Sequence, residues 1–229
     1  AFIAKTTALL KKYRPFKEYT LPIVSLLGSR RLDRFLHEAY GEARIEDLEI
    51  GCFAVSSNLS TAEVVVHDAG SLWAAVRASM SVPGVAVPVV ADGQLLIDGG
   101  VLNNLPGDVM RRRGAGTVIA VDVNDKSDLL VDDSCTPIPS PWKILWRRIN
   151  PFAKRFDVPS ILSILGRTSL LGSINKLNEV VRDVDLYLNP PVSRFGILDN
   201  DALEEIAEAG YRYAREPIAE WLARRSGAW

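Results

Sequence analysis

The chain has 229 residues, of which 48% are hydrophobic and 24% charged, and its formal net charge is -1. These values are typical of one large globular domain, or one domain with an appendage, and they give no electrostatic case for nucleic acid as a partner. Cys52 and Cys135 lack metal-ligand spacing, so we expect neither a disulfide framework nor a metal site, and a reducing compartment is favoured.

No apolar run approaches the roughly 18–20 residues that span a bilayer, and the N-terminus lacks the pattern of a signal peptide. The chain opens on Ala1 in helical-looking sequence. We therefore expect a piece of a longer protein, either cytoplasmic or peripheral to the cytoplasmic face of a membrane.

Residues 1–40 predict two or three helices, interrupted at Pro15 and Pro22. His37 falls on the last of these helices, and His67 is the only other histidine. A surface or capping role is favoured for both over membership of a Ser-His-Asp triad.

The apolar run from Ile50 to Ser57 predicts a buried strand, and 62–67 predicts its neighbour. Ser71 is expected to cap a short helix that breaks at Pro83 and Gly84. Within that helix, one face is expected to pack on the sheet, formed by Leu72, Val76 and Met80.

Two serines at the end of this helix, Ser79 and Ser81, are candidate nucleophiles. Hydroxyls that close a helix C-terminus are the favoured interpretation. Ser29, which follows a glycine, is a weaker candidate because it lacks a second glycine and a preceding strand.

Two short apolar runs flank Asp92-Gly93, a dipeptide typical of tight hairpin turns. The second strand ends on Asp98, two glycines follow, and Pro106 is expected to open a helix that stops near Gly114. Catalytic acids are often presented on such a strand end, although Asp and Gly are also ordinary turn residues.

The β-branched run 117–123 predicts a strand buried on both faces, as in a parallel sheet. With the strand and helix before it, this run predicts a βαβ unit, with Asp98 at the carboxyl end of its first strand. A nucleotide-binding domain is disfavoured because neither Gly-x-Gly-x-x-Gly nor a P-loop occurs.

Residues 124–141 are expected to form an exposed polar loop, and 142–156 contain five cations and no acid. Tryptophans with a basic flank suit a lipid headgroup region, which makes Trp142, Trp146, Arg147 and Arg148 possible membrane contacts. The alternative is a helix that buries its tryptophans in the domain. Beyond it we expect helical structure over 161–181, a last strand over 184–188 and one or two helices over 201–225.

Several motifs together resemble the patatin-like phospholipase family. They are Arg77-Ala78-Ser79-Met80-Ser81-Val82-Pro83-Gly84, Asp98-Gly99-Gly100-Val101-Leu102-Asn103-Asn104-Leu105-Pro106, and Gly114-Ala115 before Val118-Ile119-Ala120-Val121-Asp122-Val123. More narrowly, the sequence resembles the neuropathy target esterase branch of this family, including its bacterial relatives. The motifs that carry this second resemblance are Ile45-Glu46-Asp47-Leu48, Gly70-Ser71-Leu72-Trp73, Trp142-Lys143-Ile144-Leu145-Trp146 and Asn150-Pro151.

The resemblance implies an α/β fold, a three-layer α/β/α sandwich, and a Ser-Asp dyad that hydrolyses acyl esters of phospholipids and lysophospholipids. It places the acid of the dyad on Asp98, with a supporting loop of Gly99, Gly100, Asn103 and Asn104. No metal or other cofactor is expected.

The family's Gly-x-Ser-x-Gly nucleophile motif and its glycine-rich oxyanion loop do not occur in the sequence. We therefore expect 1–229 to be the C-terminal part of the domain, incomplete at the N-terminus and inactive alone, with the upstream part of the same polypeptide as its partner. Its expected divisions are 1–123 with the Asp-Gly-Gly loop, 124–160 with the Trp/Arg-rich stretch, and a helical part over 161–229. The alternative is a non-catalytic, truncated or degenerate membrane-associated module.

Overall fold

The computed structural model describes residues 2–124, 140, 142–143, 146, 149–150, 161–195 and 202–226. The predicted loop over 124–141 therefore lies almost wholly outside the described residues, as do Arg147 and Arg148.

Two helices form the N-terminal part, α1 (Phe2–Tyr13) and α2 (Arg30–Tyr40). Both proline positions fall between them, as predicted. Leu32 and Leu36, one turn apart on α2, are 3% and 1% exposed and fix the buried side of that helix.

The central sheet has four strands, all paired antiparallel, in the order β2-β1-β4-β3. The strands are β1 (Ala54–Asn58), β2 (Glu63–His67), β3 (Val89–Ala91) and β4 (Gln94–Asp98). The first predicted strand was placed too early, because Ile50 is 83% exposed and β1 begins only at Ala54.

The β3–β4 hairpin confirms the turn chemistry of Asp92-Gly93. Ala91 pairs with Gln94, which leaves a two-residue connection. Its φ angles are +50° at Asp92 and +74° at Gly93, and a type I′ turn requires positive φ at both central positions.

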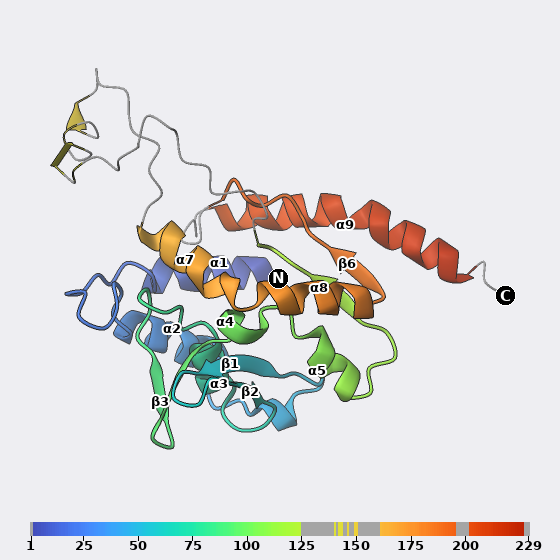
Figure 1. Ribbon diagram of the computed structural model, residues 1–229, viewed down its shortest axis with the longest axis horizontal. Coiled ribbons are helices and arrows are strands. Elements are labelled where there is room, and N and C mark those ends of the chain that lie inside the picture. Colours follow the sequence, from blue (N-terminus) through green and yellow to red (C-terminus); the bar gives the residue numbers. More distant parts are fainter. Residues whose placement is uncertain are drawn as a thin grey trace.

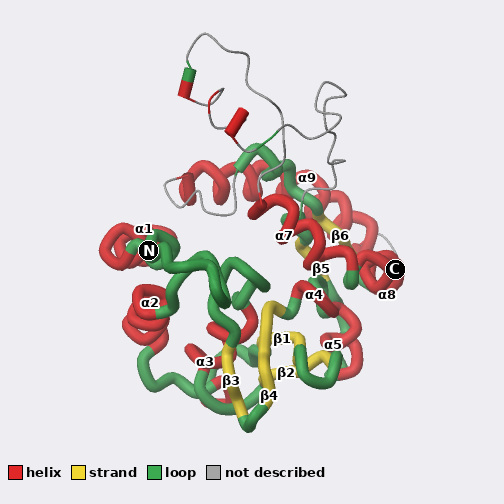
Figure 2. Tube along the Cα trace, turned by 60° about the vertical axis from the view of Figure 1, so that its left-hand side comes forward, coloured by secondary structure: helices red, strands yellow, loops and turns green. Residues whose placement is uncertain are grey.

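Helices cover both faces of the sheet, which confirms the α/β sandwich (Figures 1 and 2). On one side α3 (Leu72–Ser79) packs on β1 and β4 and is itself covered by α2. On the other, α4 (Gly100–Asn103) packs on β1 and β2, and α7 (Ile161–Leu171) lies over α4.

The face that α3 buries differs from the predicted one. Its buried residues are Ala75, Arg77 and Ala78, whereas the expected Leu72, Val76 and Met80 are only half-buried. Small alanine side chains allow the helix to approach the sheet more closely than a leucine-rich face would. Ser71 is at the N-cap as predicted, but its side chain makes no capping hydrogen bond.

The strand predicted to be buried on both faces has one exposed face. In β5 (Ile119–Val121), Ala120 is 5% exposed, whereas Ile119 and Val121 are 46% and 52% exposed. Its parallel partner is β6 (Leu186–Leu188), and β4 pairs only antiparallel, so the predicted βαβ unit is not formed by the described strands. β-branched residues favour a strand whether one or both of its faces are buried, so such a run does not identify the strand with which it pairs.

The remaining helices lie largely where they were predicted. They are α5 (Gly107–Arg112), α8 (Ile174–Asp183) and α9 (Leu203–Ser226). The helical stretch predicted over 161–181 is divided near Gly172, where a side chain would clash with the carbonyl oxygen of Val101. No residue of α9 is buried among those described, and the helix contains Pro217.

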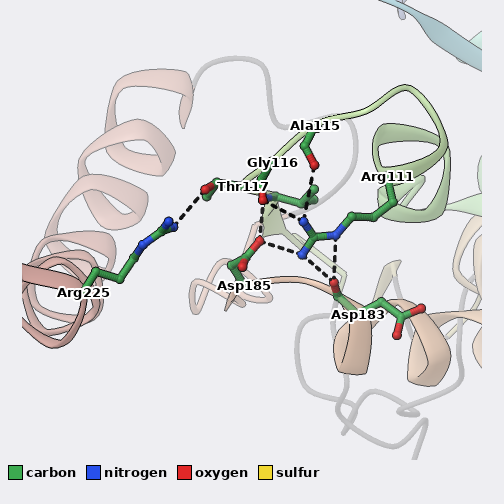
Figure 3. A network of polar contacts seen from close by, with 8 residues as sticks. Arg111, Ala115, Gly116, Thr117, Asp183, Asp185 and Arg225 are labelled. Atoms are coloured by element: carbon green, nitrogen blue, oxygen red, sulfur yellow. Dashed lines mark hydrogen bonds and ion pairs between the residues drawn. The ribbon is translucent and has the colours of Figure 1, made fainter. Parts of the chain in front are cut away.

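Arg111 of α5 joins the segments that lead into β5 and β6 (Figure 3). Its guanidinium donates to the carbonyl oxygens of Asp183 and Gly116, both at 2.9 Å, and lies 2.7 Å from the Asp185 carboxylate. Asp185 in turn accepts a 2.8 Å bond from the Val118 backbone N–H, which is the larger reason that its pKa lies below the ordinary value. One side chain thus positions the approach to both strands of the second sheet.

Among the described residues, no helix is both long enough and apolar enough to cross a bilayer.

Candidate active site

Asp98 is the last residue of β4, and its Cα partner on β1 is Ser56. Its backbone N–H donates a 2.9 Å hydrogen bond to the carbonyl oxygen of Ser81, just beyond the end of α3. The carboxyl is thus held at the junction of the sheet, the α3 end and the short helix α4.

Other atoms approach both glycines after Asp98 closely, backbone atoms at Gly99 and the ends of side chains at Gly100. A Cβ on Gly99 would lie less than 3.0 Å from the carbonyl oxygen of Val55, in the backbone of β1. On Gly100, a Cβ would lie 2.9 Å from the Asp98 Oδ1 and from the Asn104 side-chain oxygen. Neither glycine has a positive φ, so space and not backbone conformation selects glycine here.

The Asp98 carboxylate has one oxygen engaged by the loop. The Gly100 N–H donates to Oδ1 at 2.7 Å, and no partner for Oδ2 is assigned within the described part of the chain. Burial raises the pKa of Asp98 above its ordinary value of 3.8, and the Gly100 hydrogen bond opposes that rise. A carboxylate with a raised pKa is a stronger base than an exposed aspartate, which suits proton abstraction from a hydroxyl.

The two asparagines of the loop differ in their contacts. Asn103 is 3% exposed and donates a 3.0 Å hydrogen bond to Asp108. Its own side-chain oxygen is buried and has no hydrogen-bond partner among the described residues. Asn104 lies over Gly100. Neither side chain hydrogen-bonds Asp98 in the described structure.

Arg77 has a part in the site that its sequence motif does not reveal. It is 4% exposed, and its guanidinium bonds Asp33 of α2 at 2.8 Å, the Ser81 hydroxyl at 2.6 Å and the Val87 carbonyl oxygen at 2.9 Å. The backbone carbonyl oxygen of Ser81 accepts the hydrogen bond from the Asp98 N–H. Arg77 therefore holds the segment to which the Asp98 backbone is bonded. The i, i+4 spacing of Arg77 and Ser81 on a helix is the only signal in the sequence for this contact.

Three serines next to the Asp98 loop are buried, which leaves their hydroxyls unsuited to nucleophilic attack, whereas Ser79, whose carbonyl oxygen accepts the Gly99 N–H, is half-buried. Ser56, Ser57 and Ser81 are 0%, 1% and 0% exposed. The Ser81 hydroxyl donates to the Arg77 carbonyl oxygen at 2.7 Å, which confirms that it closes the end of α3.

Neither histidine has an assigned hydrogen bond to Asp98 among the described residues, although His67 contacts Ser56, the cross-strand partner of Asp98. His67 Nε2 lies 2.7 Å from the Ser56 hydroxyl, and burial lowers its pKa. His37 is exposed, and its ring centroid lies 4.0 Å from that of Trp73. Ser29 occupies the N-cap position of α2 without a side-chain hydrogen bond there.

The tryptophan-rich stretch is described at only a few positions. Trp142, Trp146 and Ile149 are helical and are 80%, 62% and 72% exposed. These exposures disagree with the alternative in which both tryptophans are buried in the domain.

Comparison with known proteins identifies a family for part of the chain. The family model of patatin-like phospholipases matches residues 11–110, a range that contains the α3 end, the hairpin and the Asp98 loop. The chain belongs to the patatin-like phospholipase family, a family of lipid esterases.

Its relatives within that family are proteins of the neuropathy target esterase type. The chain is 36% identical over 214 residues to patatin-like phospholipase domain-containing protein 6 of Homo sapiens, an alignment that covers 90% of this chain and 15% of that protein. It is 33% identical to neuropathy target esterase sws of Drosophila melanogaster, over 90% of this chain and 15% of the relative. Identity to lysophospholipase NTE1 of Candida albicans is 32%, over 93% of this chain and 15% of the relative. The chain thus spans about 15% of the length of these relatives.

Proposed function

We propose that this chain supplies the acid of a Ser-Asp dyad that hydrolyses carboxylic esters of phospholipids or lysophospholipids. The observation that carries the proposal is the Asp98 carboxyl, raised in pKa by burial and held by the Gly99-Gly100 loop with one oxygen left to meet a hydroxyl. The lysophospholipase name of one relative supports the substrate class.

In the proposed reaction, Asp98 takes the proton of a serine hydroxyl as the serine oxygen attacks the ester carbonyl. The carbon–oxygen bond to the alcohol then breaks, the alcohol leaves with the proton from Asp98, and an acyl-enzyme remains. Asp98 next deprotonates water, which releases the fatty acid and restores the serine.

The nucleophile of this dyad is expected on the upstream part of the same polypeptide, in a Gly-x-Ser-x-Gly turn. The burial of Ser56, Ser57 and Ser81 supports that assignment. We infer that 1–229 is the C-terminal part of the catalytic domain, divided at 123 and 160 as the sequence predicts, and that the protein is cytoplasmic or peripheral to the cytoplasmic face of a membrane.

Asp98→Asn tests the dyad in a polypeptide that joins this chain to its upstream part. Fatty-acid release from a lysophospholipid is expected to fall by about 10²–10⁴-fold, the contribution of a positioned general base. Circular dichroism checks that the fold is kept. Asp92→Asn, at the exposed hairpin turn, is the matched control and is expected to leave the rate unchanged. Full activity of Asp98→Asn would exclude Asp98 as the base.

A contact between the tryptophan-rich stretch and a membrane is the second proposal, and it is also compatible with a non-catalytic module. It is supported by the exposure of Trp142, Trp146 and Ile149, since indole rings favour the membrane interface. Trp142→Ala with Trp146→Ala is expected to weaken co-sedimentation with liposomes, whereas Leu59→Ala, also at an exposed position, is not. Equal binding by the double variant and the wild type would remove this stretch as a contact.

A further inference from the structure

The connection between α1 and α2 carries a second group of exposed apolar side chains. All six residues from 19 to 24 are exposed, and five of them are apolar or aromatic. Tyr19, Leu21, Ile23 and Val24 are 75%, 76%, 87% and 63% exposed. We call residues 19–24 the apolar tip. Large apolar side chains that gather at one exposed point mark a site of interaction more often than isolated ones do.

The apolar tip projects from a base that is hydrogen-bonded on both sides. Within the loop, the Thr20 N–H donates to the Leu26 carbonyl oxygen at 3.1 Å and the Gly28 N–H to that of Glu18 at 2.7 Å. Leu27 is 4% exposed, so the base is also buried. The exposed side chains are therefore displayed by an ordered loop, which Figure 1 shows as the blue projection at the left.

The base of the loop is attached to the segment that leads to the candidate site. Leu26 and Leu27 donate 2.9 Å hydrogen bonds to the carbonyl oxygens of Gly84 and Val85. That segment follows Ser81, whose carbonyl oxygen accepts the Asp98 N–H. Two backbone hydrogen bonds thus tie the base of the apolar tip to the segment that follows the Asp98 contact at Ser81.

The sequence on both sides of the apolar tip is rich in cations, of which Lys12 pairs with Glu38 and Arg30 with Glu18. Residues 11–34 contain seven lysines and arginines and two acids, although the whole chain has a net charge of -1. All seven cations are exposed: Lys11, Lys12, Arg14, Lys17, Arg30, Arg31 and Arg34. An apolar tip with a cationic flank matches the acyl chains and anionic headgroups of a lipid surface.

We propose that the apolar tip inserts into the interface of a bilayer that contains anionic lipids, with the flanking cations against the headgroups. The proposal deepens the proposed function, on which it rests, because it brings the chain that carries Asp98 to a lipid surface. A second copy of this chain would also cover an apolar surface, but two equally cationic flanks would repel each other across such a contact.

Flotation of the polypeptide that joins this chain to its upstream part, with vesicles of phosphatidylcholine and phosphatidylserine, tests this docking. Leu21→Ser with Ile23→Ser is expected to weaken binding at least about tenfold, because two apolar side chains no longer leave water. Ile50→Ser is the matched control, since Ile50 is 83% exposed on another loop, and it is expected to bind as the wild type does.

A second variant tests the charges. Lys17→Gln with Arg31→Gln is expected to weaken binding to the anionic vesicles and to leave binding to pure phosphatidylcholine unchanged. Added salt is expected to reduce the difference between this variant and the wild type.

The proposal is overturned if the wild type does not float with anionic vesicles, or if the Leu21→Ser, Ile23→Ser variant binds them equally well. It is also overturned if light scattering without lipid shows a wild-type dimer that this variant converts to a monomer. Asp98→Asn is expected to bind vesicles normally, so loss of hydrolysis and loss of docking are distinguished.

Discussion

Gly99 is the residue of the candidate site with the least room for change. A side chain there meets the backbone of β1, which cannot move without breaking the pairing of β1 with β2 and β4. Gly99→Ala is therefore expected to lower the free energy of unfolding by about 3 kcal/mol, at the upper end for overpacking. Urea denaturation measures this loss.

Gly116→Ala is the control for that prediction. No atom lies within 4 Å of a Cβ at Gly116, and its φ is not positive. The Gly116→Ala substitution is expected to change the free energy of unfolding of the chain by no more than about 0.5 kcal/mol. Equal effects of the two substitutions would contradict the steric argument.

Asp98 has opposite effects on stability and on the proposed reaction. Because burial raises its pKa in the folded chain, Asp98 favours folding when protonated, and this contribution is lost as the pH rises through the raised value. An asparagine in its place would be neutral at every pH. Asp98→Asn is thus expected to gain stability relative to the wild type between acidic and neutral pH, as measured by urea denaturation over that range.

This prediction is contradicted if the free energies of unfolding of Asp98→Asn and the wild type differ by the same amount at every pH. The same substitution is expected to remove hydrolysis. The chain would therefore retain a carboxyl that destabilises it near neutral pH because the reaction requires a base.

At the scale of elements, Arg77 joins α2, α3 and the segment at Val87. Its side chain is 5% exposed, and removal of one member of a buried ion pair leaves the other charge without compensation. Arg77→Leu is expected to lower the free energy of unfolding by about 3 kcal/mol, at the lower end for buried pairs because Asp33 is partly exposed.

Arg112→Leu provides the comparison, because Arg112 pairs with Asp108 at the surface with its side chain 66% exposed. Its expected effect is less than about 1 kcal/mol, as for other exposed ion pairs. If denaturant midpoints moved equally in the two variants, Arg77 would have no special part in holding the elements together.

The elements that could be predicted are those specified by nearby residues. Asp92-Gly93 determines its own turn, and Pro15 and Pro22 separate α1 from α2, because backbone conformation decides both. The strand that pairs with β5 could not be predicted from local sequence, because Ile119 pairs with Leu186, which lies far along the chain. The Arg77 contacts and the buried alanine face of α3 likewise depend on tertiary packing.

The candidate site was predictable in part for the same reason. Asp98 and its glycines are contiguous, so their motif indicates a strand end and a close approach. The close neighbour of Gly99, Val55, lies on another strand, and no local pattern identifies it. The role of Asp98 stays a prediction until the substitution is measured.

At the scale of the whole molecule, α9 is weakly connected to the core. It has no buried residue and packs on β6 and α1, whereas Val55 of β1 and Leu96 of β4 are 6% and 5% exposed. Amides of α9 are expected to exchange with solvent at least about a hundredfold faster than those of β1 and β4, because local opening exposes little apolar surface. Hydrogen exchange followed by mass spectrometry measures this; equal protection would contradict it.

The two sheets differ in their tolerance of added chain length. The hairpin into β4 is sensitive to insertion, because its two-residue turn with positive φ at both positions sets the register that presents Asp98. Strands β5 and β6 are joined by a much longer connection, and doubling a long loop costs only about 0.6 kcal/mol in closure entropy. In homologous chains, length variation is therefore expected between β5 and β6, with the β3–β4 turn constant in length.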